Sequence, residues 1–113
     1  MGIEITGWGK CTPSAVLTNN DLESILDTDD EWITTRTGVK QRRIAEAPLS
    51  ELGTIAAKHA LAAADKDPNE IDAVMMATCT PEFLIPSTAS RVQMNIGNKT
   101  AAAFDFNSAC TGF

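Results

Sequence analysis

The sequence predicts an α/β fold in which helices cover a mixed, mainly parallel sheet. A nearly continuous apolar stretch at residues 71–78 is typical of a strand that is covered on both faces. A second apolar strand is predicted at 101–106, and a helix predicted between the two strands allows them to run parallel. The complete order of predicted elements is β-α-α-α-β-α-β, with right-handed crossovers between the parallel strands.

The first part of the chain supplies one strand and two short helices. Residues 3–8 alternate apolar and polar side chains, which predicts a strand. Residues 20–26 predict a short helix, because their three large apolar side chains fall on one face. A second helix is predicted between the N-cap candidate Asp29 and Gly38. The acidic run at 29–31 therefore fits helix capping and predicts no metal site.

Two further helices belong to the second part of the chain. The longest helix is predicted over 50–64, where alanines allow close packing on a sheet. A turn cluster at 65–69 separates it from the following strand. Another helix is predicted over 86–96, with proline near its start and Gly97 past its end.

Composition limits the class of protein. A chain of 113 residues, with 43% hydrophobic and 21% charged residues, is long enough for one modest domain. No apolar run approaches the ~20 residues of a membrane span, so no membrane insertion is expected. A net charge of −6 argues against a general nucleic-acid surface. Three cysteines without a secretory signal predict reduced thiols and a cytoplasmic location.

Four basic residues lie within eight positions, against this acidic background. They are Arg36, Lys40, Arg42 and Arg43. Such a cluster suits a phosphorylated ligand, but clusters of this kind are more often solvated turns.

Cys110 is the candidate nucleophile. It follows the predicted strand at 101–106 and a turn of small polar residues, where a helix is expected to begin. Backbone N–H groups and a helix N-terminus favour a thiolate at such a turn. The alternative for any cysteine is a small buried thiol, which is the prediction for Cys11 and Cys79.

Three separated segments, in order, resemble one family. They are the stretch DTDDEWITTRTGV at 27–39, the pair TCTP and IPST at 78–81 and 85–88, and AFDFNSACTGF at 103–113. Along its whole length the chain is similar to the N-terminal portion of β-ketoacyl-acyl-carrier-protein synthase III, a thiolase-fold condensing enzyme. The resemblance implies that residues 1–113 form the N-terminal segment of that layered fold and end at the nucleophile turn.

The resemblance also implies a reaction in fatty-acid synthesis. Cys110 would take an acyl group from acyl-coenzyme A and join it to malonyl-acyl carrier protein with loss of carbon dioxide. Acyl-coenzyme A is a substrate, so no cofactor is expected. The resemblance also implies that the protein forms a homodimer. The family's catalytic histidine and asparagine lie downstream of the cysteine. His59 is instead predicted to be a partly exposed helix residue, and Asn107 to suit the turn before Cys110.

The resemblance implies that Thr28, Trp32 and Arg36 belong to the coenzyme A site. Trp32 and Arg36 are spaced i, i+4 and share one helix face. The indole would stack on adenine and the guanidinium would meet phosphate, while Thr28 would lie near the adenine. The alternative for Trp32 is a core aromatic.

Ile85 is expected to line the acyl pocket, because the family residue before the Pro-Ser pair reaches the partner's pocket in a homodimer. The alternative is that Ile85 only packs in the dimer interface. Two other functions stay open: a relative with a different acceptor, and a non-catalytic module that binds coenzyme A or a partner. Residues 1–113 alone are expected to be inactive and prone to associate, with the rest of the fold on a further segment.

Overall fold

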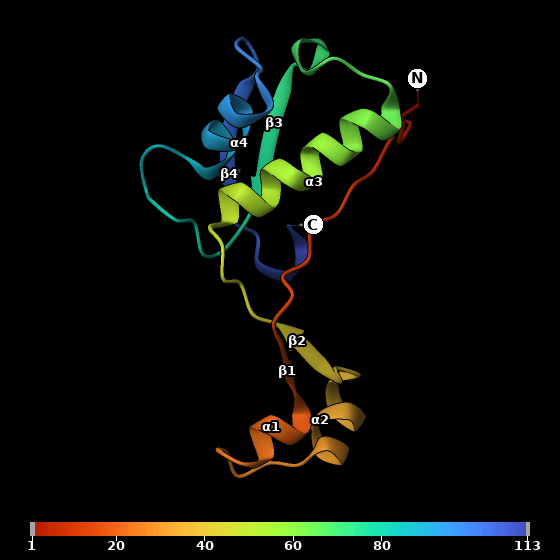
Figure 1. Cartoon of the computed structure of the whole chain (residues 1–113), viewed down its shortest axis with the longest axis vertical. Helices are drawn as coiled ribbons and strands as arrows, with labels where there is room; N and C mark the ends of the chain where they lie inside the picture. The colour runs from red at the N-terminus through yellow and green to blue at the C-terminus, as the bar shows by residue number, and fades with distance from the viewer. Residues whose placement is uncertain (1, 113) are drawn as a thin grey trace. The chain divides into compact units, whose positions relative to one another are not determined.

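The computed structural model describes residues 2–112, which fold into two compact units. The smaller unit is Thr12–Glu46. The larger unit contains the residues up to Cys11 together with those from Ala47 onward. Neither junction carries a linker signal in the sequence, so this division was not predicted. Figure 1 shows the course of the chain through both units.

The larger unit contains the predicted parallel strand pair. Strands β3 (Ala73–Ala77) and β4 (Ala102–Phe106) pair in parallel, with Ala73 opposite Ala102 and Ala77 opposite Phe106 (Figure 1). Helix α4 (Thr88–Ile96) connects them and contacts both strands. The predicted strands and crossover helix are therefore confirmed, with the helix beginning at Thr88.

Helix α4 is fixed to the sheet at its N-terminus. The carboxylate of Asp105, on β4, accepts hydrogen bonds from the backbone N–H groups of Thr88 and Ala89, both at 2.7 Å. Ser87 caps the same helix through the N–H of Ser90, 3.1 Å away. Acidic acceptors at a helix N-terminus satisfy donors that have no partner within the helix. Ala89 and other apolar residues of α4 form the small core under this contact.

Helix α3 (Leu49–Ala64) packs against α4 and confirms the predicted long helix. It ends at Asp65, which adopts the left-handed conformation with φ 52°. A short 3-10 helix, η1 (Pro68–Glu70), follows within the predicted turn cluster and leads into β3.

One face of the β3–β4 pair is exposed in the described residues. Met75 is 61% exposed, and Phe104 and Phe106 lie on the same open face. Exposure alternates along both strands, as expected when helices cover a single face. Within residues 2–112, the predicted cover of β3 is therefore present on one face only.

The predicted strand at residues 3–8 is absent from the described structure. This segment is extended, and it runs beside α3 without pairing with a strand (Figure 1). A Cβ added at Gly7 would lie 2.5 Å from the carbonyl oxygen of Ala60 and 2.8 Å from the Cβ of Ala64. Gly9 is equally close to the backbone of Ala56. Glycine thus allows the segment to touch the helix backbone.

The smaller unit is an antiparallel strand pair, and the chain segment that connects the two strands forms two helices. Strand β1 (Val16–Thr18) pairs with β2 (Gln41–Arg43), with Val16 opposite Arg43. Neither strand was predicted. Helix α1 (Asn19–Glu23) begins one residue earlier and ends three residues earlier than predicted. Its predicted apolar face is incomplete, because Ile25 and Leu26 lie beyond the helix and are exposed.

Helix α2 (Asp30–Thr37) confirms the predicted capping. The Asp29 carboxylate accepts a hydrogen bond of 2.6 Å from the N–H of Trp32. Gly38 ends the helix in the left-handed conformation with φ 73°. Ile33 is the buried apolar residue of this helix. Within residues 2–112, no helix has the length and apolar character needed to cross a membrane.

Candidate functional site

Cys110 lies on an exposed turn just after the carboxyl end of β4. The turn is η2, a 3-10 helix at Ala109–Thr111, and the N–H of Thr111 donates to the carbonyl of Ser108 at 3.0 Å. Ala109, directly before the cysteine, has a φ of 46°. This left-handed backbone is unfavourable for alanine, so the surrounding contacts must hold it. A single 3-10 turn stands where the sequence predicted the start of a helix.

The turn that carries Cys110 folds back on the ends of both strands. A Cβ added at Gly112 would lie 3.5 Å from the Cβ of Ala77, at the end of β3. It would lie 3.6 Å from the ring of Phe106, at the end of β4. Ligands of parallel sheets commonly bind beyond the carboxyl ends of the strands. Cys110 is on the edge of the sheet that suits a reacting group.

Asn107 connects the turn that carries Cys110 with the loop after β3. Its Oδ1 accepts a hydrogen bond from the N–H of Ala109 at 3.0 Å, which confirms the predicted turn role. The same oxygen accepts from the thiol of Cys79 at 3.2 Å. Cys79 is exposed, so the prediction of a buried thiol there is wrong: the residue lies beyond β3, not inside it. Cys11 is partly buried.

His59 is exposed on α3, in agreement with the prediction. Its Nδ1 lies 3.2 Å from the backbone carbonyl of Lys10. This contact joins the ring to the extended N-terminal segment and gives it a structural role.

The candidate coenzyme A residues gather on and beside α2. Thr28 and Trp32 line one open groove of about 700 Å³, together with apolar residues that include Leu22 and Ile33. Trp32 is 54% exposed, which removes the alternative that it is a core aromatic of this unit. The guanidinium carbon of Arg36 lies 4.9 Å from the centroid of the Trp32 ring. The pair therefore presents a flat aromatic surface and a permanent positive charge side by side.

The basic cluster divides into two pairs. Arg42 donates to the side chain of Asn19 at 2.6 Å, and Arg43 donates to the carbonyl of Pro13 at 3.1 Å. Both guanidinium groups thus have partners inside the unit. Arg36 and Lys40 are exposed and are the two members of the cluster that best suit an anionic ligand.

Ile85 lies in the larger unit, in the loop before α4. It is 89% exposed and lines an open groove of about 590 Å³ with Phe83, Pro86, Ser90, Arg91 and Met94. The guanidinium of Arg91 lies 5.0 Å from the Phe83 ring centroid. The groove is therefore mainly apolar with one cation at its border, as an acyl pocket or an apolar interface would require.

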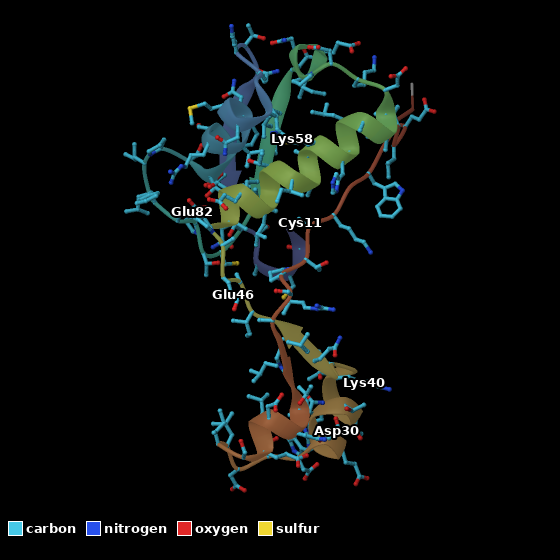
Figure 2. All side chains as sticks on the ribbon, in the orientation of Figure 1. Cys11, Asp30, Lys40, Glu46, Lys58 and Glu82 are labelled. Atoms are coloured by element: carbon cyan, nitrogen blue, oxygen red, sulfur yellow. The ribbon has the colours of Figure 1, made fainter. Side chains whose placement is uncertain are left out.

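Glu82 anchors the loop that carries Ile85. Its carboxylate accepts hydrogen bonds from the N–H and the hydroxyl of Ser50, in the first turn of α3, and pairs with Arg91 at 3.0 Å. Figure 2 labels Glu82 near the start of α3. The Ser50 N–H is the main cause that lowers the pKa of Glu82 below its ordinary value, with smaller contributions from the Ser50 hydroxyl and Arg91. Nothing in the sequence pattern pointed to this contact.

Known proteins match the chain along nearly all of its length. Beta-ketoacyl-[acyl-carrier-protein] synthase III 2 of Vibrio cholerae is 59% identical over 97% of the chain. The crystal structure of 3-oxoacyl-[acyl-carrier-protein] synthase III from Aquifex aeolicus superposes with a TM-score of 0.93 at 51% identity, over 99% of the chain. A priming β-ketosynthase from the R1128 polyketide pathway superposes with a TM-score of 0.90 at 35% identity, over 97% of the chain.

The chain spans only part of each of these proteins: 30% of the Vibrio cholerae protein, 37% of the Aquifex aeolicus chain and 34% of the priming ketosynthase. No protein-family model matches it. The predicted resemblance and the predicted fold are nevertheless confirmed. By sequence and by fold, the chain is similar to the N-terminal portion of the β-ketoacyl-[acyl-carrier-protein] synthase III proteins, which have the thiolase fold, and it spans about a third of their length.

Proposed function

We propose that this chain contributes the nucleophile and the coenzyme A groove of a condensing enzyme that initiates fatty-acid synthesis. One observation carries the proposal: a chain 59% identical to a named synthase III has an exposed cysteine on the turn after β4. Cys110 is the acyl acceptor in this proposal. The exposed Trp32–Arg36 pair supports a separate role for α2 in binding the nucleotide end of the substrate.

The first half-reaction loads the acyl group. The Cys110 thiolate attacks the thioester carbonyl of acyl-coenzyme A, and a new thioester forms as the coenzyme A thiolate leaves and takes up a proton. Trp32 stacks on the adenine, Arg36 contacts phosphate, and Thr28 lies beside the adenine. A thiolate is a far better nucleophile than a serine hydroxyl at neutral pH, which is why the chemistry suits a cysteine.

The second half-reaction forms the carbon–carbon bond. Malonyl-acyl carrier protein loses carbon dioxide, and the resulting carbanion attacks the carbonyl of acyl-Cys110. The carbon–sulfur bond then breaks and regenerates the thiolate. The histidine and asparagine that the family uses to stabilise these charges are not assigned to His59 or Asn107, whose contacts are with Lys10 and Ala109. Residues 1–113 alone are therefore proposed to be inactive.

The same proposal includes an oligomeric state and a cellular location. The enzyme acts as a homodimer in which Ile85 contributes to the partner's acyl pocket; its exposure supports a role in contacts outside its own unit. Three free cysteines support a cytoplasmic location. A second candidate function is condensation with a different acceptor, since a priming ketosynthase of a polyketide pathway has a closely similar fold.

The test supplies the complete protein with acetyl-coenzyme A and malonyl-acyl carrier protein. Acetoacetyl-acyl carrier protein should form, Cys110→Ser should abolish it, and Cys11→Ser should retain it. Product formation only when malonyl-coenzyme A replaces the carrier protein would favour the second candidate. Undiminished product in Cys110→Ser would overturn the assignment of the nucleophile.

A further inference from the structure

Asn19 is a buried polar side chain at the centre of the smaller unit. It is 1% exposed, and it is one of the two largest fully buried side chains of the described residues. Its Nδ2 donates to Asp30 Oδ1 at 2.7 Å, to the carbonyl of Val39 at 2.8 Å and, more weakly, to Thr34 Oγ1 at 3.4 Å. Its Oδ1 accepts a hydrogen bond of 2.6 Å from Arg42.

These partners come from different elements. Asp30 and Thr34 belong to α2, Arg42 belongs to β2, and Val39 lies in the connection between them. The N–H of Asn19 also donates to the carbonyl of Lys40 at 3.3 Å. A single side chain at the start of α1 therefore fixes α2 to the strand pair (Figure 2 labels Asp30 and Lys40 in this unit).

The helix geometry gives this contact a consequence for the coenzyme A groove. Asp30 and Thr34 are spaced i, i+4 and share a hydrogen bond of 3.2 Å on the face of α2 that meets Asn19. Trp32 and Arg36 are displaced from them by two residues. At about 100° per residue this is a rotation of about 200°, so the stacked pair lies on the opposite face. Fixing one face of α2 sets the direction of the other.

We propose that Asn19 is a positioning residue for the nucleotide end of acyl-coenzyme A. The inference rests on the proposed function and adds a residue that touches no substrate. Asn19 holds the rotation and tilt of α2, and thereby the indole and guanidinium that bind adenine and phosphate. Loss of its hydrogen bonds lets α2 shift, so the nucleotide end of the substrate binds less well while the acyl transfer chemistry is unchanged.

Asparagine suits this position because it both donates and accepts. Arg42 requires an acceptor, whereas Val39 and Asp30 require donors. A leucine of similar size would remove all of these hydrogen bonds and would leave the partly buried Arg42 guanidinium without its acceptor, which costs more than an absent hydrogen bond on the surface. An aspartate would satisfy Arg42 but would place two carboxylates together at Asp30.

The test compares two substrates on the complete protein. Acetyl-coenzyme A carries the nucleotide, and S-acetyl-N-acetylcysteamine presents the same thioester without it. Asn19→Ala should lower kcat/KM for Cys110 acylation by acetyl-coenzyme A about tenfold, through KM and not through kcat. Acylation by the truncated thioester should be unchanged.

Asn98→Ala is the matched control. Asn98 is 4% exposed in the larger unit, donates to the carbonyls of Pro68 and Ile71, and accepts from the N–H groups of Thr100 and Ala101. Its removal should destabilise the fold without changing the ratio of the two substrates. An equal ratio change in Asn19→Ala and Asn98→Ala would overturn the proposal.

Two further measurements keep the proposal testable if Asn19→Ala folds poorly. Arg42→Gln removes the guanidinium donor and should change the substrate ratio in the same direction by a smaller factor. In a Trp32→Ala background, Asn19→Ala should add little to the loss, because Asn19 acts through that face of α2. Full additivity, or an unchanged ratio in Arg42→Gln, would contradict the proposal. Absence of wild-type acylation by either thioester would instead refute the proposed function.

Discussion

The guanidinium of Arg36 stacks over the indole ring of Trp32 on an exposed face of α2, with 4.9 Å between the guanidinium carbon and the ring centroid. The pair needs no partner from the larger unit to form, because both residues belong to one eight-residue helix. The contact keeps the charged group and the flat ring at one site, where a ligand with both a phosphate and a base can use them together.

Arg36→Ala should weaken binding of acyl-coenzyme A and make that binding less sensitive to salt. Removing one charge-assisted contact costs about 1.5–3 kcal/mol, which corresponds to a rise in KM of roughly ten- to a hundredfold. Steady-state kinetics at two ionic strengths measures both effects. Lys58→Ala is the control, since it removes an exposed positive charge that lies on α3, outside the basic cluster. Unchanged coenzyme A binding in both Arg36→Ala and Trp32→Ala would locate the binding site elsewhere.

Ile85→Phe should shift the acyl preference towards acetyl. Isoleucine leaves more room in the groove than phenylalanine, so the wild type should accept medium or branched acyl groups. Each buried methylene contributes about 0.8 kcal/mol, or roughly fourfold in affinity. Rates with acetyl-, butyryl-, isobutyryl- and octanoyl-coenzyme A measure the preference. Leu84→Phe, on an exposed neighbour, should keep the wild-type profile. If Ile85→Phe keeps it too, Ile85 is only an interface residue.

Gly7→Ala should destabilise the larger unit, because its Cβ would meet the carbonyl oxygen of Ala60 at 2.5 Å. The backbone of α3 cannot move away without losing its packing on α4, and overpacking of this kind costs about 1–3 kcal/mol. Urea denaturation gives the free energy of unfolding. Gly2→Ala has open space around it and should be neutral. Equal stability of the two variants would mean that the N-terminal segment does not pack on α3.

Glu82 should make the stability of the larger unit depend on pH in the acidic range. Its pKa is lower in the folded state than its ordinary value of 4.5, mainly because the Ser50 N–H donates to the carboxylate. The contribution is therefore present at neutral pH and is lost as the pH falls through the folded-state pKa.

Glu82→Gln keeps the shape but removes this titration, so its melting temperature should fall less than that of the wild type between about pH 7 and about pH 3.5. Thermal unfolding followed by circular dichroism at several pH values measures the difference. Glu51→Gln removes an exposed carboxylate from the same first turn of α3 and should retain the wild-type slope. Identical slopes for Glu82→Gln and the wild type would rule out the role of this carboxylate.

Helix ends were the features that the sequence predicted best. Asp29, Gly38 and Gly97 act through their own backbone and side chains, so local sequence is sufficient to identify them. Strand pairing needs a distant partner. Residues 3–8 alternate like a strand but pair with none in the described structure, and the three-residue strands β1 and β2 are too short to have a detectable period.

The candidate site was predictable only in part. Trp32 and Arg36 could be paired from their i, i+4 spacing, because a helix brings such residues together. Asn19 gave no signal beyond a helix start, since its partners lie 11 to 23 residues away in sequence. Glu82 and Ser50 are likewise 32 positions apart. Contacts of this kind depend on the tertiary fold, and a single sequence does not record them.

The most direct test of the proposed nucleophile is to locate the acyl group after the complete protein meets acetyl-coenzyme A. The protein is quenched in acid, digested and analysed by mass spectrometry, which separates peptides containing Cys11, Cys79 and Cys110. We predict one acetyl group on the Cys110 peptide and none on the others, with the label lost when malonyl-acyl carrier protein is added. An acetyl group on Cys79 or Cys11, with Cys110 unmodified, would contradict the account.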